Sequence, residues 1–536
     1  MRPRLYDTTL RDGTQREGLS LSVEDKLRIA RRLDAFGVDY IEGGWPGSNP
    51  KDAAFFRRIR DVPLRHARVA AFGSTRRAGT TCEADANVRA LLDADTPVVT
   101  LVGKSSPWHV ERVLGTTRAE NLRMIADTVA FLAALGKEVV YDAEHFFDGW
   151  HADAEYARET VRAAAEAGAS CVVLCDTNGG SLPRAVGEVV AAVRARLDVP
   201  LGIHPHDDCG LALANALAAV EAGCTHVQGT INGYGERCGN LDLVRLVATL
   251  QLKMGIACVP AIAALRELSH AVAAIANLNP DPHAPYVGRS AFAHKGGLHA
   301  AAFAKDPMTY QHVDPACVGN EARVVVSELA GRSSVRARAA ELGLASDDPS
   351  RDASVADAVL AQIKAFEHEG AQFEAAAGSF ELLVRRATAG YAAPFELVEY
   401  ATTSARRGDG SGDGRGDGRV DGRSPAVAAV TLRVVGEVVR TCATGDGPVH
   451  ALDRAVRAAL LPTYPALADV RLADYKVRIV DEHLGTAART RVLVESTDGD
   501  AWWSTVGWGA DVIEASWHAL RDALELPLAR RAVRPT

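Results

Sequence analysis

The chain has 536 residues, too many for one ordinary hydrophobic core and enough for one large domain with smaller ones beside it. Its formal net charge of −8 gives no electrostatic argument for nucleic acid or an anionic membrane as a partner. The sequence contains no run of about 18 apolar residues, so no segment is predicted to span a membrane. The first residues lack the apolar core of a signal peptide, and the cysteines form no CxxC pair, so we expect a cytoplasmic protein.

Residues 1–260 alternate between short apolar runs and amphipathic helical patterns. The runs predicted as strands are RLYDTTL, DYIEGG, HARVAAFG, PVVTLVG, KEVVYDAEHF, ASCVVLCDTNG, VPLGIHPHDD and THVQGTINGYG. Eight strand–helix repeats in about 250 residues are typical of a (β/α)8 TIM barrel, an α/β fold. A doubly wound open sheet is the alternative, but no GxGxxG follows the first strand.

Two further parts follow the predicted barrel. Residues 261–393 are rich in alanine and are predicted to form helical linker subdomains. Residues 394–536 return to strand patterns and predict a C-terminal α+β domain, in which AVAAVTLRVVGEVV is the second strand and VIEASWHALRDAL the last helix. A Gly/Asp/Arg stretch at about 405–424 is predicted to be a disordered loop within that domain.

Polar side chains gather at the ends of the predicted barrel strands, where barrel enzymes place their chemistry. Scattered surface charge would not coincide so often with strand ends. These residues are Arg11, Asp12, Glu42, Glu144, Asp176, Thr177, His204, His206 and Asn240.

His204 and His206 give the most specific signal. Residues i and i+2 of a strand point to the same side, so both imidazoles can bind one cation, with Asp12 supplying a carboxylate from the first strand. Such a set suits Mn²⁺, Mg²⁺, Co²⁺ or Zn²⁺ about equally. The alternative is a pair of ordinary histidines, hydrogen-bonded at a strand end.

Three separated motifs resemble those of the isopropylmalate, homocitrate and citramalate synthases. They are LRDGTQREG at 10–18, HPHDDCGLALANALAAVEAG at 204–223 and INGYGERCGN at 231–240. Two more, IEGGWPGSNPKD at 41–52 and HKGGLHAAA at 294–302, most resemble the long bacterial citramalate synthase branch. The resemblance extends over the whole chain and includes the regulatory domain at the C-terminus that this family carries.

The resemblance implies a metal site. Asp12, His204 and His206 match the metal ligands, and Asn240 matches a further ligand or a residue that supports one. The chain departs from the family at Asp207, where asparagine is common. This added carboxylate could tighten or reorient metal binding.

The resemblance also implies substrate roles. Arg11 matches the arginine that steadies the keto oxygen, Thr177 the hydroxyl that holds the keto-acid carboxylate, and Glu144 an acid/base carboxylate. Gln15 and Glu42 match supporting positions. The plainer interpretations are that Glu42 only pairs with Arg11, and that Thr177 only caps the helix expected near residue 181.

His299 and Tyr310 match linker residues that complete the family's site, either in the same chain or in a partner subunit. A base must remove a methyl proton from acetyl-CoA, and His299, alone or paired with Glu144, is the candidate. Tyr310 packing without a catalytic role is the alternative. Which group abstracts the proton stays open.

The activity implied is a Claisen-type condensation of acetyl-CoA with pyruvate, giving (R)-citramalate for isoleucine synthesis. A larger 2-keto acid is the first alternative, since the motifs do not size the pocket, which Phe72, Val102 and Asp142 could line. A catalytically silent amino-acid sensor and a lyase of the same superfamily are weaker alternatives. The resemblance also implies a homodimer that isoleucine inhibits. GDGPVHALDRA at 445–455 is predicted to be a Gly/Pro turn that leads into a helix, and the free backbone N–H groups of that helix are expected to bind the amino-acid carboxylate.

Overall fold

The computed structural model describes residues 2–295, 299, 302–303, 305–325, 331–346, 348–404, 425–480 and 482–531. Contacts divide the chain into two compact units. The first comprises Met1–Phe292 and His312–Ala322, and the second comprises Ala293–Gln311 and Arg323–Thr536. The loop predicted at about 405–424 lies outside the described residues.

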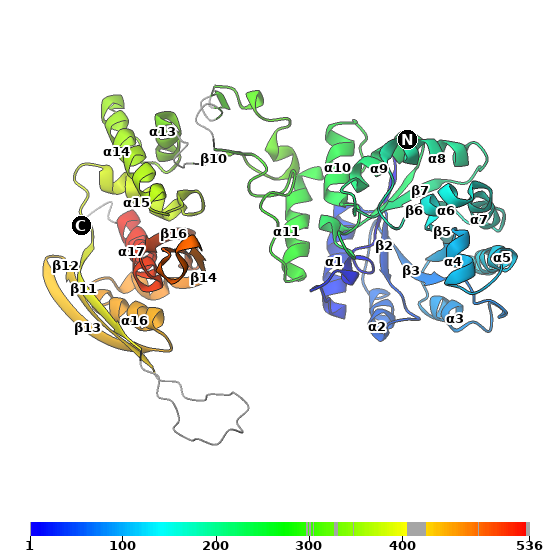
Figure 1. Cartoon of the computed structure of the whole chain (residues 1–536), viewed down its shortest axis with the longest axis horizontal. Coiled ribbons are helices and arrows are strands. Elements are labelled where there is room, and N and C mark those ends of the chain that lie inside the picture. The colour runs from blue at the N-terminus through cyan, green and yellow to red at the C-terminus, as the bar shows by residue number, and fades with distance from the viewer. Residues whose placement is uncertain are drawn as a thin grey trace, which may run out of the picture. The chain divides into compact units, whose positions relative to one another are not determined.

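The first unit is a closed barrel of eight parallel strands (Figure 1). The barrel closes because β1 pairs with β2 on one side and with β8 on the other. The TIM barrel prediction is therefore confirmed, and the open-sheet alternative was wrong. The strands are β1 Arg4–Asp7, β2 Tyr40–Gly44, β3 Arg68–Ser74, β4 Val98–Lys104, β5 Glu138–Glu144, β6 Cys171–Asp176, β7 Leu201–Pro205 and β8 His226–Gly229.

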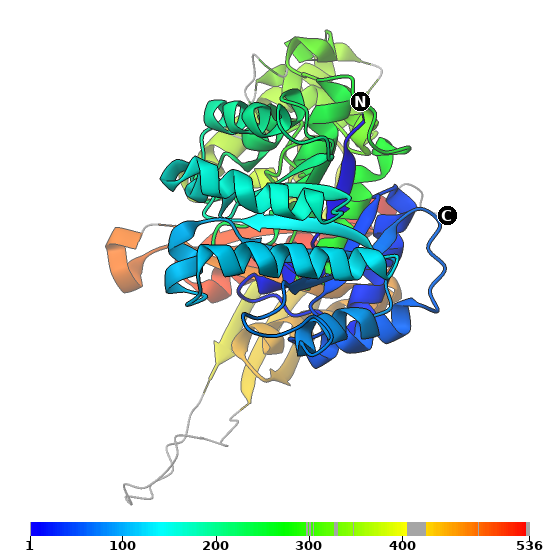
Figure 2. The ribbon, with the colours of Figure 1, turned by 90° about the vertical axis from the view of Figure 1, so that its right-hand side faces the viewer.

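Helices surround the strands, and in the side view the blue and cyan helices lie on the outside of the barrel (Figure 2). The first has clear start and stop signals: Ser22 and Asp25 form a capping box, and Gly37 ends it with a φ of 97°. The helices are α1 Val23–Phe36, α2 Pro50–Ile59, α3 Ala86–Asp93, α4 Pro107–Arg112, α5 Arg118–Ala134, α6 Phe146–Ala152, α7 Ala154–Glu166, α8 Pro183–Arg194, α9 Ala212–Glu221, α10 Leu243–Leu252 and α11 Leu265–Ile275.

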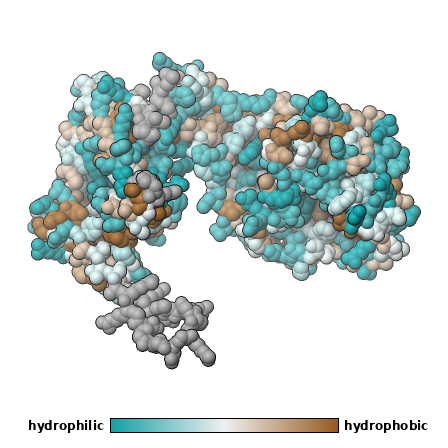
Figure 3. Space-filling view, in the orientation of Figure 1, coloured by the Kyte–Doolittle hydropathy of each residue, from teal (hydrophilic) through white to brown (hydrophobic). Residues whose placement is uncertain are grey.

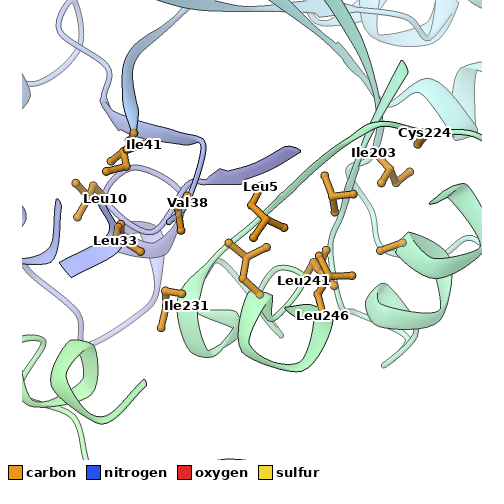
Figure 4. Close-up of a cluster of buried hydrophobic side chains, with 14 of the residues drawn as sticks. Leu5, Leu10, Leu33, Val38, Ile41, Ile203, Cys224, Ile231, Leu241 and Leu246 are labelled. Atoms are coloured by element: carbon orange, nitrogen blue, oxygen red, sulfur yellow. The ribbon is translucent and has the colours of Figure 1, made fainter. Parts of the chain in front are cut away.

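Two apolar layers hold the barrel together. The larger fills the space between strands and helices, and Figure 4 shows part of it, where Ile41 of β2 lies near Leu10 and near Leu33 of α1. A smaller cluster, which includes Tyr6 and Tyr40, fills the barrel interior. Burial of these side chains supplies the driving force for the fold, and it leaves the carboxyl ends of the strands free for polar groups.

The described residues of the second unit form helices and three small sheets. Its helices are α13 Arg332–Glu341, α14 Pro349–His368, α15 Ala377–Ala387, α16 Pro448–Leu460 and α17 Val512–Arg531. Its strands are β9 Ala293–His294, β10 Arg323–Val324, β11 Phe395–Thr403, β12 Ala426–Val434, β13 Glu437–Gly445, β14 Arg471–Ile479, β15 Thr490–Thr497 and β16 Trp502–Gly509. β9 pairs with β10, while β11–β13 and β14–β16 form two antiparallel sheets, each followed by a long helix. The predicted α+β character is confirmed.

One predicted strand was wrong. The run AVAAVTLRVVGEVV was predicted as a single strand, but the chain turns at Val435 and Gly436, whose φ angles are 49° and 85°. β12 and β13 therefore form a hairpin. A glycine inside a strand pattern is a turn signal, and here the continuous apolar run concealed it.

A buried ion pair fixes the loop between β2 and α2. The ammonium of Lys26 is 2% exposed; it pairs with the Asp52 carboxylate and donates to the carbonyl of Gly43 at 3.1 Å. Burial lowers the pKa of Lys26, and the charge of Asp52 opposes that shift. Asp52 also accepts the backbone N–H of Trp45 at 2.9 Å.

We expect Asp52→Ala to destabilise the barrel by about 3–5 kcal/mol, because it leaves the buried ammonium of Lys26 without a partner. Thermal and urea unfolding measure the loss. Glu24→Ala is the control: its pair with Arg58 is half exposed on both sides, so the expected change is under about 1 kcal/mol. Equal stability of the two variants would contradict the assignment.

Candidate functional site

A cavity of about 750 Å³ opens at the carboxyl ends of the barrel strands. It is lined entirely by residues of the first unit, including Phe72, Val102 and Asp142, which the sequence had suggested. The other predicted site residues that line it are Arg11, Asp12, Gln15, Glu144, Thr177, His204 and His206.

Asp12, His204 and His206 come together in this cavity. Each offers one ligand atom, and these atoms all lie within 4.8 Å of one another. The three side chains are buried, and the Oδ2 atom of Asp12 lies 3.2 Å from Nε2 of His204. The i, i+2 spacing on β7 places both imidazoles on one side, with ring centroids 5.2 Å apart. We call these three residues the candidate metal cluster.

The cluster suits a divalent cation. Burial, followed by the charge of His204, lowers the pKa of His206 to about 4, so this imidazole is neutral at pH 7, the form that binds metals. Burial alone would raise the pKa of Asp12, but Arg11 and His204 hold it well below its usual value and keep the carboxylate ionised.

Asn240 adjoins the cluster. Its Nδ2 donates to Asp12 at 3.0 Å and lies 3.2 Å from Nε2 of His204, while its buried Oδ1 has no hydrogen-bond partner among the described residues. A buried amide oxygen without a partner is costly in a protein that holds no ligand there. Its contacts fit either prediction, a further ligand or a supporting group.

Arg11 is held rigidly beside the cluster. Its Nε donates to Glu42 at 2.5 Å and its Nη1 to Asp12 at 2.7 Å, while Cζ lies 3.9 Å from the ring centroid of Phe72. Burial would lower the pKa of Arg11, but the two carboxylates raise it above its usual value. The guanidinium is therefore a fixed positive charge at the cavity wall. Glu42 does pair with Arg11, and it also accepts the hydroxyl of Tyr6 at 2.6 Å.

Glu144 and Thr177 lie on neighbouring strand ends. Glu144 forms an ion pair with Lys104, another cavity residue. Thr177 Oγ1 accepts the backbone N–H of His145 at 2.9 Å. It does not cap α8, which begins at Pro183 and has no side-chain cap. The capping interpretation of Thr177 was therefore wrong, and its hydroxyl remains available at the cavity.

His299 and Tyr310 belong to the second unit. Their rings stack with centroids 4.2 Å apart, and Tyr310 is 43% exposed. Tyr310 therefore contacts His299 and does not pack into a core. The catalytic roles of both residues stay predictions.

Comparison with known proteins places the chain in a family. Residues 2–272 match the HMGL-like family, residues 286–370 the homocitrate synthase post-HMGL domain-like family, and residues 374–528 the LeuA allosteric (dimerisation) domain. The chain is 50% identical to an (R)-citramalate synthase of Streptomyces coelicolor, over 99% of this chain and 97% of the relative. It is 48% identical to one of Synechocystis, over 98% and 96%. This chain belongs to the (R)-citramalate synthase family.

Another relative, which also matches over nearly its full length, is less similar. A probable 2-isopropylmalate synthase of Methanopyrus kandleri is 31% identical over 99% of both chains. The family resemblance inferred from the motifs is thereby confirmed. Among the described residues, no helix is long and apolar enough to cross a membrane.

Sequence reasoning missed Arg237. Its guanidinium binds Asp208 at 2.7 and 3.0 Å, donates to the carbonyl of Thr177 at 2.8 Å, and lies 3.3 Å from Nδ1 of His206. Its φ of 54° is unusual for a non-glycine residue and shows that the loop is tightly specified. Its place in the GERCGN motif was the available signal.

Asp207, the departure from the family, has a structural contact. Its carboxylate accepts the backbone N–H of Ala212 at 2.9 Å, at the start of α9. The added carboxylate therefore binds the first backbone N–H of α9, and the idea that it tightens metal binding finds no support in its contacts.

The candidate metal cluster can be tested by substitution. We expect His206→Ala to fold normally and to lose high-affinity Mn²⁺ binding, because one of the three proposed ligands is removed. Titration of the metal-stripped protein, with free Mn²⁺ followed by electron paramagnetic resonance, measures the dissociation constant. His151→Ala removes an exposed histidine and should bind like the wild type. Unchanged binding by His206→Ala would refute the three-ligand cluster.

Proposed function

We propose that this chain condenses acetyl-CoA with pyruvate and hydrolyses the thioester, releasing (R)-citramalate and CoA. The observation that carries the proposal is the identity of about half of all residues, over nearly the full length, with relatives named (R)-citramalate synthase. The barrel cavity supports it, because it combines a candidate metal cluster with a fixed guanidinium.

The residues of the cavity suit this reaction. A divalent cation, Mn²⁺, Mg²⁺, Co²⁺ or Zn²⁺, held by Asp12, His204 and His206 would polarise the keto carbonyl of pyruvate. Arg11 would stabilise the negative charge that develops on the keto oxygen when the acetyl carbon attacks. Its pairing with Glu42 fixes that charge in place before the reaction, so little reorganisation is needed.

Other residues would bind substrate and move protons. Thr177 would donate its hydroxyl to the keto-acid carboxylate, and Gln15 lies on the same cavity wall. Glu144 is partly exposed there, so it can exchange a proton with a bound molecule. We propose His299, with Tyr310, as the contribution of the second unit to proton abstraction. Water then cleaves the thioester, which makes the sequence irreversible.

The keto acid can be tested directly. We expect kcat/KM for pyruvate to exceed that for 2-ketoisovalerate and 2-ketoglutarate by more than tenfold, measured by CoA release from acetyl-CoA. One unfilled methylene changes binding by only about 1–3 kcal/mol, so a larger preference requires steric exclusion of longer chains. A preference for 2-ketoisovalerate would move the chain to the isopropylmalate branch.

We also propose that the protein is a cytoplasmic homodimer that acts in isoleucine synthesis. Each chain would consist of three parts: the catalytic barrel at 1–260, the helical linker subdomains at 261–393 and the C-terminal regulatory domain at 394–536. The LeuA allosteric (dimerisation) match supports dimerisation and effector binding. Apolar side chains are exposed on the strands of that part, including Val398, Val438, Val477 and Trp502. Brown patches on its surface in Figure 3 agree with this.

All nine cysteines are free, which suits the reducing compartment of the proposed cytoplasmic protein.

The start of α16 supports isoleucine binding. The predicted Gly/Pro turn does lead into this helix, and its N-cap residue Gly447 provides no side-chain cap. The second sheet–helix half of the domain has Asp511 in the corresponding place, where it accepts the backbone N–H groups of Ile513 and Glu514 at 2.7 and 3.0 Å. The first helix thus has free N–H groups that an amino-acid carboxylate can occupy.

We expect isoleucine to inhibit the intact enzyme more strongly than leucine or valine, and Gly447→Asp to lose that inhibition. The new carboxylate would cap α16 as Asp511 caps α17. Gly447 has an extended φ of −159° and open space around it, so basal activity should be kept. Ala392→Asp, which adds a carboxylate at an exposed loop position of the same unit, is the control. Equal inhibition of Gly447→Asp and wild type would refute this effector site.

A further inference from the structure

A hydrogen-bonded chain of three side chains crosses the barrel interior beneath the candidate metal cluster. Nδ1 of His204 lies 2.6 Å from Oε1 of Gln228, and Nε2 of Gln228 donates to Oδ1 of Asp142 at 2.9 Å. The three residues belong to β7, β8 and β5 and are at most 5% exposed. Only Asp142 and His204 line the cavity, so Gln228 lies behind the cavity wall.

The amide of Gln228 has a direction, and Asp142 sets it. One end of an amide only donates and the other only accepts. Because the Asp142 oxygen accepts, the NH2 end of Gln228 must face it, and the oxygen end must face His204. The bond persists if Asp142 takes up a proton, since that proton can sit on its other oxygen.

The direction of the amide decides which nitrogen of His204 carries a hydrogen. An amide oxygen opposite Nδ1 requires Nδ1–H. In the neutral ring the lone pair then lies on Nε2, the nitrogen 3.2 Å from Asp12 in the cluster. A buried imidazole held in this tautomer is ready to bind a cation without rearrangement.

We propose that Gln228 and Asp142 are positioning residues for His204: the amide, oriented by the carboxylate, holds the imidazole in the tautomer and orientation that bind the metal. The proposal rests on the metal site of the proposed function. The sequence suggested Asp142 only as a pocket-lining residue. The proposal gives it a second role, because it orients Gln228, which in turn orients the proposed ligand His204.

The alternative is that Gln228 and Asp142 merely fill the barrel interior. The two roles respond differently to conservative changes. Asp142→Asn keeps the volume and an oxygen that accepts from Gln228, so it preserves the orientation of the amide. Asp142→Leu keeps the branched shape of the side chain, with a larger volume, and removes the acceptor. Gln228→Met keeps the length of the side chain and removes both ends of the amide.

The test is Mn²⁺ binding to the metal-stripped full-length protein, with free Mn²⁺ followed by electron paramagnetic resonance and folding checked by thermal unfolding. We expect Gln228→Met and Asp142→Leu to weaken binding about 10–100-fold, and Asp142→Asn to stay within about twofold of wild type. Thr100→Val is the control: it removes a buried hydroxyl of the same interior that bonds Tyr6 and not His204, and it should bind like wild type.

Each result decides between the roles. Wild-type affinity in folded Gln228→Met would overturn the proposal, and so would equal losses in Asp142→Asn and Asp142→Leu. If Gln228→Met does not fold, the comparison of Asp142→Asn with Asp142→Leu still decides. Loss of Mn²⁺ binding in His204→Ala but not in these variants would refute positioning and leave the metal site standing. No binding by wild type would instead refute the metal site itself.

A second readout follows the tautomer. In long-range proton–nitrogen spectra of the metal-free protein, the His204 ring should show Nδ1 protonated, because the amide oxygen of Gln228 faces that nitrogen. The His204→Ala variant assigns the signals. In Gln228→Met we expect a mixture of tautomers, whereas an unchanged pattern would contradict the role of the amide.

Discussion

A continuous line of hydrogen bonds joins the charged groups inside the barrel, and the candidate site depends on it. It runs from Glu42 through Arg11 to Asp12, and Asp12 in turn contacts His204. The interior is too dry to hold these charges singly, because an unpaired buried charge costs several kcal/mol. Each charge is therefore tolerated only because its neighbour is present, which fixes the positions of all of them.

The closed barrel makes this line possible. Its members lie far apart in sequence, since Glu42 belongs to β2 and His204 to β7. Asn240, which donates to Asp12 at 3.0 Å, is 228 residues away from it along the chain. Pairing of β1 with β8 brings the two ends of the barrel sequence together. The apolar cores on both sides of the strands stabilise the barrel, and this stability offsets the free-energy cost of burying polar groups at the carboxyl ends of the strands.

The sequence predicted the candidate metal cluster better than its surroundings. His204 and His206 are two residues apart on one strand, so the strand period alone placed both imidazoles together. Gln228 could not be found in this way, because its partner Asp142 lies 86 residues away on another strand. Arg237 is similar: its contacts to Asp208 and Thr177 depend on how three loops meet. Local patterns do not encode such meetings. The turn at Gly436 was a different kind of miss, since its signal was present in the sequence.

The division of the chain into units bears on the proposed inhibition by an effector. The chain leaves the first unit after Phe292, returns to it at His312, and leaves it again after Ala322. His299 and Tyr310 lie in the excursion and therefore belong to the same unit as the allosteric-domain match. The barrel holds the metal cluster and Arg11, but this unit holds the proposed proton-abstracting group.

An effector bound to the second unit can inhibit only by favouring an arrangement in which the site works less well. Because His299 is part of that unit, such a rearrangement need not be transmitted through the packed core of the barrel. The candidate metal cluster and the Arg11–Glu42 pair lie wholly in the first unit, whereas the proposed proton-abstracting residue His299 lies in the second. The proposed inhibition would therefore lower turnover and leave metal binding intact, because Asp12, His204 and His206 all lie in the first unit.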